Sequence, residues 1–322
     1  MPQKMRVCNS SHYNKLLKNR GNIFSLMKTI LTADSDKSYS ARQGMKYSDT
    51  FIIKIYTVGY LLKLPLRQLC GFFEDYAKNQ NLDVSIPDYS TLSRRLKNLN
   101  VNIVDKRDNI SDYADIDLAI DSTTVSIYSN TGTHSKNNAQ SRKYSGYDQA
   151  RKIHVAVDIN TKTVKSMLYT HGTYADHRAA SPLMEDASSK NNILTVRADS
   201  AYDRKPCYQT CYNLNIKPII KPLRTAAIKS SGIFKERNKT IMTIKNNGPY
   251  EQGVTVWKNE QKYGKRSYVE NFFSRFKIIF GFSLKNKTEE NRRNESAIKC
   301  NILNIFTRAG TARFELVKKS II

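Results

Sequence analysis

Apolar residues recur at helical spacing between residues 47 and 100 and predict a group of helices. Pro65 can begin a second helix at its first turn, and Asp88 can cap a third helix over Tyr89–Leu99. The residues before this region, 1–46, are basic and polar and predict an arm, in which Tyr13–Thr29 could hold a short helix. The residues at helical spacing in the first helix are Ile52, Ile55, Tyr56, Gly59, Tyr60 and Lys63.

The second and third of these helices resemble a helix-turn-helix, because the third carries basic and hydroxyl side chains away from its apolar face. Its leucines share one face, whereas Arg94 and Arg95 point elsewhere. The loop between the two helices, about ten residues, is longer than the usual three or four. We therefore expect residues 47–110 to be a helical DNA-binding region, and the alternative is an all-helical support domain with a solvated basic face.

After Asn100 the pattern changes to strands that alternate with helices. The expected strands are Asp117–Tyr128, Lys152–Ile159, Thr163–Tyr169, Asn192–Ala198 and Lys217–Ile220. The expected helices between them are Ala175–Ser188 and Asp203–Leu214. This order predicts a mixed sheet with covering helices, so residues 111–322 are expected to form an α/β domain. Within it Ser129–Arg151 is an expected loop, and Ala226–Tyr250 has no clear period.

The net charge of the chain predicts the kind of partner that it binds. Of 322 residues, 53 are Lys or Arg and 28 are Asp or Glu, which gives a formal net charge of +25 at pH 7. Such an excess points to a polyanion, and nucleic acid is the leading candidate because Lys and Arg that neutralise phosphates release counterions. A basic surface with a purely structural role is the alternative.

Cysteine usage and hydropathy exclude other classes. The five cysteines are scattered, and Cys207 and Cys211 have no second Cys or His pair nearby, which is poor spacing for zinc. The sequence has no window of about 18 apolar residues, so a membrane span is not expected. The N-terminus lacks the apolar run of a signal peptide. The sequence therefore predicts a cytoplasmic protein with reduced thiols and no membrane partner.

Two aspartates are placed by the strand pattern. Asp121 lies inside the first expected strand, where a charge is costly unless it is paired or bound to metal. Asp199 directly follows an apolar run, and α/β sheets place ligands at the C-terminal ends of their central strands. A cap or turn role is the alternative for each of them.

A third carboxylate, Glu270, lies on a long helix that we expect to begin near Tyr263. Four residues share a polar stripe on this helix, within roughly 60° of one another at about 100° per residue: Tyr263, Arg266, Glu270 and Lys277. An aromatic face for packing lies beside the stripe and contains Val269, Phe272, Phe273, Phe276 and Phe280. A surface salt bridge between Arg266 and Glu270, which are four residues apart, is the alternative.

The three carboxylates together suit one chemistry. They can hold two Mg²⁺ ions, for which Mn²⁺ can substitute, since carboxylate oxygens are the ligands that hard cations prefer. One ion would activate water or a 3′-hydroxyl, and the other would stabilise the leaving oxygen of a phosphodiester. Arg266 and Lys277 would bind the flanking phosphates.

These residues resemble the DDE transposases of bacterial insertion sequences. Tyr263-x2-Arg266-x3-Glu270-x6-Lys277 matches the Y(2)R(3)E(6)K signature of that family at every position. The segments around Asp121 (Ala119–Thr123) and Asp199 (Ala198–Asp203) are similar to its two aspartate motifs. Further segments resemble insertion sequence family five, namely Tyr47–Asp49, Leu64–Gln68, Pro87–Arg95 and Glu290–Glu295.

The resemblance, which covers nearly the whole chain, implies an RNase H-like mixed sheet flanked by helices. It implies that Asp121, Asp199 and Glu270 are the catalytic, metal-binding triad. By the same resemblance Arg266 and Lys277 contact DNA near the transposon end. The resemblance also implies a DNA contact for Tyr263, by a looser correspondence.

The expected function is a cut-and-join reaction on double-stranded DNA. The protein would bind the terminal inverted repeats of its element and attack target DNA with the freed 3′-hydroxyl ends, with Arg94 and Arg95 as further DNA contacts. Two ends must be held together, so we expect a homodimer or a larger synaptic assembly in the bacterial cytoplasm, at the nucleoid. The alternatives are an inactive or regulatory DNA-binding protein, and an RNase H-like nuclease without strand transfer.

Four other polar residues have plainer interpretations. Asp117 is expected at the entry of its strand, and Asp158 in a turn. His154 alternates with apolar neighbours and is expected to be a packed core histidine. Asp176 is expected to cap its helix.

Overall fold

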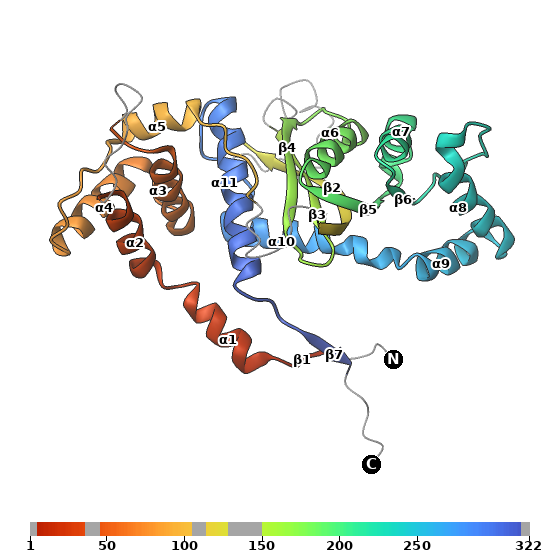
Figure 1. Ribbon diagram of the computed structural model, residues 1–322, viewed down its shortest axis with the longest axis horizontal. Coiled ribbons are helices and arrows are strands. Elements are labelled where there is room, and N and C mark those ends of the chain that lie inside the picture. Colours follow the sequence, from red (N-terminus) through yellow and green to blue (C-terminus); the bar gives the residue numbers. More distant parts are fainter. Residues whose placement is uncertain (1–4, 36–45, 105–113, 128–149, 317–322) are drawn as a thin grey trace, which may run out of the picture. The chain divides into compact units, whose positions relative to one another are not determined.

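The computed structural model divides the chain into two compact units (Figure 1). Unit 1 comprises Met1–Asn100 and Ile302–Ile322, and unit 2 comprises Val101–Asn301. Residues 302–316 therefore belong with the N-terminal helices, whereas the sequence pattern groups all of 111–322. The structure describes residues 5–35, 46–104, 114–127 and 150–316. Most of the expected loop Ser129–Arg151 lies outside these ranges.

Unit 1 contains helices and one short strand pair. Its helices are α1 Ser10–Asn19, α2 Ile23–Ser35, α3 Asp49–Leu62, α4 Leu66–Asn79 and α5 Tyr89–Asn98, and its antiparallel strands are β1 Met5–Val7 and β7 Phe314–Leu316. The apolar pattern correctly predicts α3, α4 and α5, which pack on one another. Their buried side chains include Ile52, Ile55, Leu69, Phe73, Leu92 and Leu96.

Side-chain oxygens begin two of these helices. At the start of α3 the backbone N–H of Phe51 donates to the Ser48 hydroxyl at 2.9 Å. Asp88 caps α5, as predicted, and its carboxylate accepts from the backbone N–H groups of Ser90 at 2.7 Å and Thr91 at 3.1 Å. Such caps satisfy donors that the first turn of a helix leaves without partners.

The polar character of residues 1–46 predicts an arm, whereas the described part of this segment forms β1, α1 and α2. Arg20 Nη2 donates to the carbonyl oxygens of Phe306 and Gly310 at 2.7 and 2.6 Å, so the segment binds the C-terminal part of unit 1. Contacts with such distant residues leave no local pattern in the sequence. α2 packs on α3 and contributes three fully buried or nearly buried side chains, Met27, Ile30 and Leu31.

Unit 2 is built on a five-stranded mixed sheet, which confirms the predicted α/β class. Its strands are β2 Ala114–Ser126, β3 Ala150–Asp158, β4 Val164–His171, β5 Asn191–Ala198 and β6 Lys217–Ile220. They lie in the order β4-β3-β2-β5-β6. β3 is antiparallel to both β2 and β4, whereas β5 is parallel to both β2 and β6. β2 is therefore the central strand.

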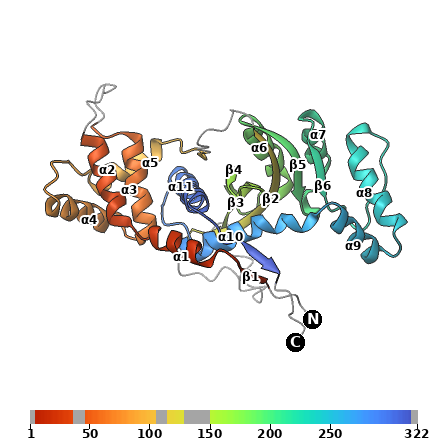
Figure 2. The ribbon, with the colours of Figure 1, turned by 60° about the horizontal axis from the view of Figure 1, so that its bottom comes forward.

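Helices cover both faces of this sheet (Figures 1 and 2). On one face lie α6 Asp176–Ser188 and α7 Lys205–Asn213, which enclose an apolar core with the strands. On the other face α10 Ser267–Phe280 crosses β2 and β3 and buries its aromatic side chains, as predicted. α11 Glu289–Arg308 follows. No helix within the described ranges is long and apolar enough to cross a membrane.

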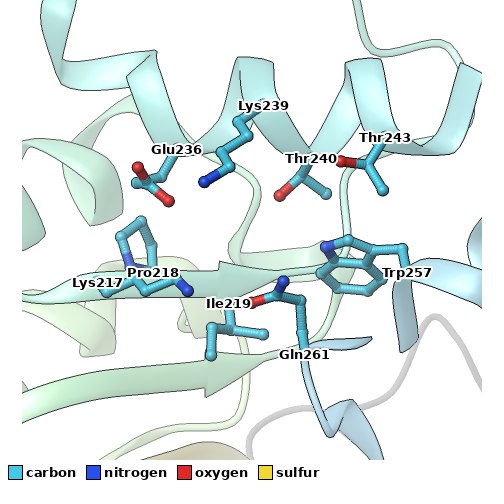
Figure 3. A pocket seen from close by; sticks show the side chains of 9 residues that line it. All are labelled: Lys217, Pro218, Ile219, Glu236, Lys239, Thr240, Thr243, Trp257 and Gln261. Carbon is cyan, nitrogen blue, oxygen red and sulfur yellow. The ribbon is translucent and has the colours of Figure 1, made fainter. Parts of the chain in front are cut away.

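A helical pair, α8 Lys235–Asn246 and α9 Tyr250–Glu260, lies beside the edge strand β6 (Figure 2). α8 falls in the segment without a clear period. Gly253 of α9 allows the two helices to meet, because a Cβ there would stand 1.9 Å from the carbonyl oxygen of Ile244. A small pocket separates α8 and α9 from β6 (Figure 3) and is lined by Lys217, Pro218, Ile219, Glu236, Lys239, Thr240, Thr243, Trp257 and Gln261. None of the three candidate carboxylates lines this pocket.

Candidate active site

The sheet register brings the two candidate aspartates to neighbouring strands. In the parallel pairing of β2 and β5, Ala119 stands opposite Arg197. Two residues further along each strand are Asp121, inside β2, and Asp199, directly after the last residue of β5. Both aspartates therefore lie at the centre of the sheet, where β5 ends.

Glu270 approaches Asp121 from α10. Arg266 links the two acids, since its Nη1 lies 3.0 Å from Asp121 Oδ2 and its Nη2 donates to Glu270 Oε1. The side chains of Asp121 and Arg266 are 22% and 20% exposed, whereas that of Glu270 is 51% exposed. The expected salt bridge between Arg266 and Glu270 is thus present, but Arg266 also binds Asp121 on β2.

The signature residues do not share one continuous α-helix. Tyr263 and Arg266 lie in a short 3₁₀ helix, η4 Tyr263–Arg266, and α10 begins at Ser267. Glu270 is in the first turn of α10 and Lys277 is in its last turn. The expected single polar stripe is therefore broken between Arg266 and Glu270, although these two side chains still meet.

More negative than positive side chains surround Asp121. Burial raises the pKa of the Asp121 carboxyl, and repulsion from Asp199 and Glu270 raises it further. The Ser122 N–H and Arg266 lower this pKa, but the net shift is upward. Burial lowers the pKa of the Arg266 guanidinium, but its interactions with Tyr263 and with the three acids raise this pKa overall. Three acids thus interact around one arginine.

The donor chemistry of this cluster fits a hard divalent cation, because its ligands would be carboxylate oxygens that repel one another. The buried Tyr202 hydroxyl, which has no hydrogen-bond partner among the described residues, interacts electrostatically with Asp121 and Asp199. The side chains as they stand do not form a finished cage. In the described ranges no three His, Cys, Asp or Glu side chains are grouped closely enough to hold a metal ion. The guanidinium of Arg266 lies between two of the three acids.

Tyr263 holds the end of β5. Its hydroxyl donates to the carbonyl oxygen of Ala198, the residue before Asp199, at 3.0 Å. Burial raises the pKa of this phenol to about 12, and only 8% of the residue is exposed. Its ring packs on the buried Trp257 with 5.0 Å between ring centroids. These contacts favour a positioning role for Tyr263 over an exposed contact with DNA.

The other expected DNA contacts differ in their surroundings. The ammonium of Lys277 lies 5.6 Å from the ring centroid of Phe282. Arg94 is exposed, and its guanidinium donates to the Thr91 hydroxyl at 3.4 Å. Arg95 is half-buried and bonds the Asp49 carboxylate at 2.5 Å, so it fastens α5 to the start of α3.

The simpler expectations for three polar residues have separate outcomes. His154 is fully buried, as predicted, and its Nε2 lies 2.9 Å from Thr170 Oγ1. Asp158 makes the expected turn, in which its carboxylate accepts from the Asn160 N–H at 3.0 Å. The expectation that Asp176 caps α6 is wrong. The N-cap is Ala175, and the Asp176 side chain turns to the sheet, where it accepts from Ser122 Oγ at 2.7 Å.

A buried ion pair close to Asp199 escaped the sequence analysis. Arg237 Nε donates to Asp203 Oδ1 at 2.6 Å, and the Asp203 side chain is fully buried. The same carboxylate accepts from the Tyr208 hydroxyl at 2.9 Å and from the Leu223 N–H at 2.9 Å. The only signal in the sequence is that Asp203 closes the motif that begins at Ala198, since Arg237 lies in a segment without a clear pattern.

His154→Gln should reduce the loss of the free energy of unfolding that occurs as the pH falls. Burial lowers the pKa of His154 to about 4 from its usual 6.5, and Lys152 opposes the charged form while Asp176 favours it. Between these two pH values the unfolded chain binds the proton and the folded chain does not, so stability falls as pH falls. The variant should remove up to about 1.4 kcal/mol per pH unit from this slope, measured by urea unfolding across that interval. The exposed His171, replaced in the same way, is the control, and an unchanged slope in His154→Gln would contradict the prediction.

Two protein-family models match the chain, and both are described as a transposase DDE domain. One matches residues 113–305 and the other matches residues 18–130. Among solved structures the Drosophila P element transposase strand transfer complex is similar to the chain at 11% identity, covering 87% of this chain and 85% of that chain with a TM-score of 0.32. The first family match spans more than half of the chain.

Proposed function

The chain belongs to the transposase DDE domain family, and from this premise we propose that it is the transposase of a bacterial insertion sequence related to insertion sequence family five. It binds the terminal inverted repeats of its element, cleaves the DNA there and joins the freed 3′ ends to target DNA. The observation that carries the proposal is the bridge from Arg266 to Asp121 and Glu270, which unites the signature motif with the central strand.

The sheet supports an RNase H-like catalytic core. Its central strand β2 carries Asp121, and its parallel neighbour β5 leads directly into Asp199. The third acid comes from a helix on one face, far along the chain. Acids that come from rigid strands and a helix are held more precisely than acids on loops.

Asp121, Asp199 and Glu270 would hold Mg²⁺, or Mn²⁺ in its place, in a pair of sites. Bound there, the ions supply Lewis-acid activation of the attacking oxygen and stabilisation of the leaving oxygen. Asp121 is held by the Ser122 N–H at 2.8 Å, which keeps one of its oxygens oriented toward its own backbone. Arg266 has to release both carboxylates before they can bind an ion, and its guanidinium is then free to bind a phosphate.

Further cations would bind DNA outside the reacting phosphate. Lys277 lies two turns along α10 from Glu270, on the same side of the helix, and can reach the next phosphates. Arg94 is exposed on α5, in the helical region proposed to bind the terminal repeats. Arg95 contributes by holding α5 on α3. Because both ends of the element react together, the active species is a homodimer or a larger assembly, and it works on chromosomal DNA at the nucleoid.

The test is an assay with a duplex that carries the inverted repeats flanking the gene. With Mg²⁺ the purified protein should nick this DNA at the repeat ends and should join pre-cut ends to a plasmid. Removal of Mg²⁺ by EDTA should stop both reactions and leave the protein bound to the repeat, because binding depends on Lys and Arg.

Two other results would each identify a different protein. Binding to the repeat without any cleavage in Mg²⁺ or Mn²⁺ would indicate a regulatory DNA-binding protein. Cleavage without joining of pre-cut ends would indicate an RNase H-like nuclease. A scrambled repeat of the same length and composition is the control for sequence recognition.

A further inference from the structure

A polar cluster lies on the α6 side of the central strand, behind Asp121. The carboxylate oxygen Oδ1 of Asp176 accepts from Ser122 Oγ at 2.7 Å and from Lys152 Nζ at 2.9 Å. Lys152 Nζ also donates to the carbonyl oxygen of Tyr174 at 3.0 Å. His154 Nδ1 lies 3.7 Å from the same oxygen of Asp176. One carboxylate thus holds two strands at once.

The sheet register places these strand residues on one face. Ser122 stands opposite His154 in the pairing of β2 with β3, and Thr124 stands opposite Lys152. Residues two apart on a strand point to the same side, which here is the side covered by α6. Apolar side chains of this layer surround the cluster and include Ala156, Ala179, Ala180 and Leu183. Stability alone does not call for a charged pair in such a layer, because well-packed apolar residues can serve equally well.

The cluster is connected to the candidate active site through Ser122. Asp121 and Ser122 are consecutive residues of a strand, so their side chains point to opposite faces of the sheet. The N–H of Ser122 donates to Asp121 Oδ1 at 2.8 Å, while its hydroxyl donates to Asp176 on the far face. Fixing the hydroxyl restrains the peptide unit between the two residues, and the N–H of that unit orients the Asp121 carboxylate.

We infer that Asp176 is a positioning residue for the active site, which acts through Ser122 and sets the direction of the Asp121 carboxylate. The inference rests on the proposed function, in which Asp121 binds a divalent cation. Residues that orient metal ligands from behind typically change metal affinity by about 10–100-fold when they are replaced. The ammonium of Lys152 holds the Asp176 carboxylate in place.

The experiment measures Mn²⁺ binding to the full chain by titration calorimetry without DNA, and the Mg²⁺ dependence of nicking beside it. Ser122→Ala and Asp176→Ala should each weaken Mn²⁺ binding by about tenfold. Ser122→Thr should bind Mn²⁺ about as tightly as the natural protein, because threonine keeps the hydroxyl. Asp186→Ala, an exposed aspartate near the other end of α6, is the matched control and should bind Mn²⁺ like the natural protein.

Thermal unfolding of the same variants separates positioning from support of the fold. A variant that melts earlier but binds Mn²⁺ as tightly as the natural protein would overturn the inference, since Asp176 would then serve stability alone. If the natural protein binds no Mn²⁺ and Asp121→Asn changes nothing, the proposed function is rejected and the inference with it. If Asp121→Asn abolishes Mn²⁺ binding but Ser122→Ala and Asp176→Ala do not weaken it, only the inference is rejected.

Discussion

Glu270→Gln is expected to abolish strand cleavage while the protein continues to bind the terminal repeat. The substitution keeps the shape of the side chain but removes the charge that would help to hold the metal ions. Lewis-acid stabilisation of the reacting oxygens is worth several kcal/mol. Each 1.36 kcal/mol is a factor of ten in rate, so the nicking rate should fall by roughly three orders of magnitude or more.

DNA binding provides the second measurement on this variant. The Glu270 side chain is 51% exposed and shares Arg266 with Asp121. Removing one negative charge should leave the affinity for the repeat unchanged or raise it, because the freed arginine can then bind phosphate. Gel-shift titration at two salt concentrations checks this.

The exposed Glu260 at the end of α9, replaced by Gln, is the matched control for charge. It should cleave at the natural rate. Cleavage at the natural rate by Glu270→Gln would exclude this glutamate from the reaction. Loss of cleavage together with loss of DNA binding would instead point to misfolding, which circular dichroism of the same sample reveals.

Much of the sheet could be predicted because each buried strand is visible in the sequence as a local run of apolar and β-branched residues. β6 is found at the expected residues, and the other strands of the sheet differ from expectation only at their ends. The same holds for Asp121 and Asp199, since a charge within or directly after an apolar run is visible without any tertiary knowledge. Their proximity follows from one parallel strand pair, which the alternation of strands and helices already favours.

Other features depend on contacts between distant residues and left no such pattern. α8 is rich in polar residues, and it is ordered by the Arg237 pair and by packing beside β6. α2 is ordered by packing on α3. The role of Asp176 could have been sought in β3, where Lys152 and His154 put two polar side chains on one face of a strand that is otherwise buried. A first-turn aspartate, however, is also what an ordinary helix start requires.

The buried pair of Asp203 and Arg237 should dominate the stability of unit 2. Arg237→Met removes the guanidinium. Among the residues that the structure describes, the Tyr208 hydroxyl and the Leu223 N–H are then the donors left to the fully buried Asp203 carboxylate. Removing one partner of a buried ion pair costs about 3–5 kcal/mol, because the remaining charge stays in a medium of low polarity. We expect the free energy of unfolding to fall by that amount in urea titrations.

Lys239→Met removes an exposed cation from the same helix and should change stability by less than about 1 kcal/mol. The double variant Asp203→Asn, Arg237→Met should recover part of the loss, because no buried charge remains. The amide oxygen can accept from the Leu223 N–H, and the amide NH2 can donate to the Tyr208 hydroxyl oxygen. A loss no larger than that of Lys239→Met would mean that water reaches Asp203. The same measurement bears on the active site, because Asp203 lies one residue beyond the 3₁₀ turn that Asp199 caps. Arg237→Met should therefore lower cleavage together with stability at temperatures where the fold begins to melt, and should restore it on cooling.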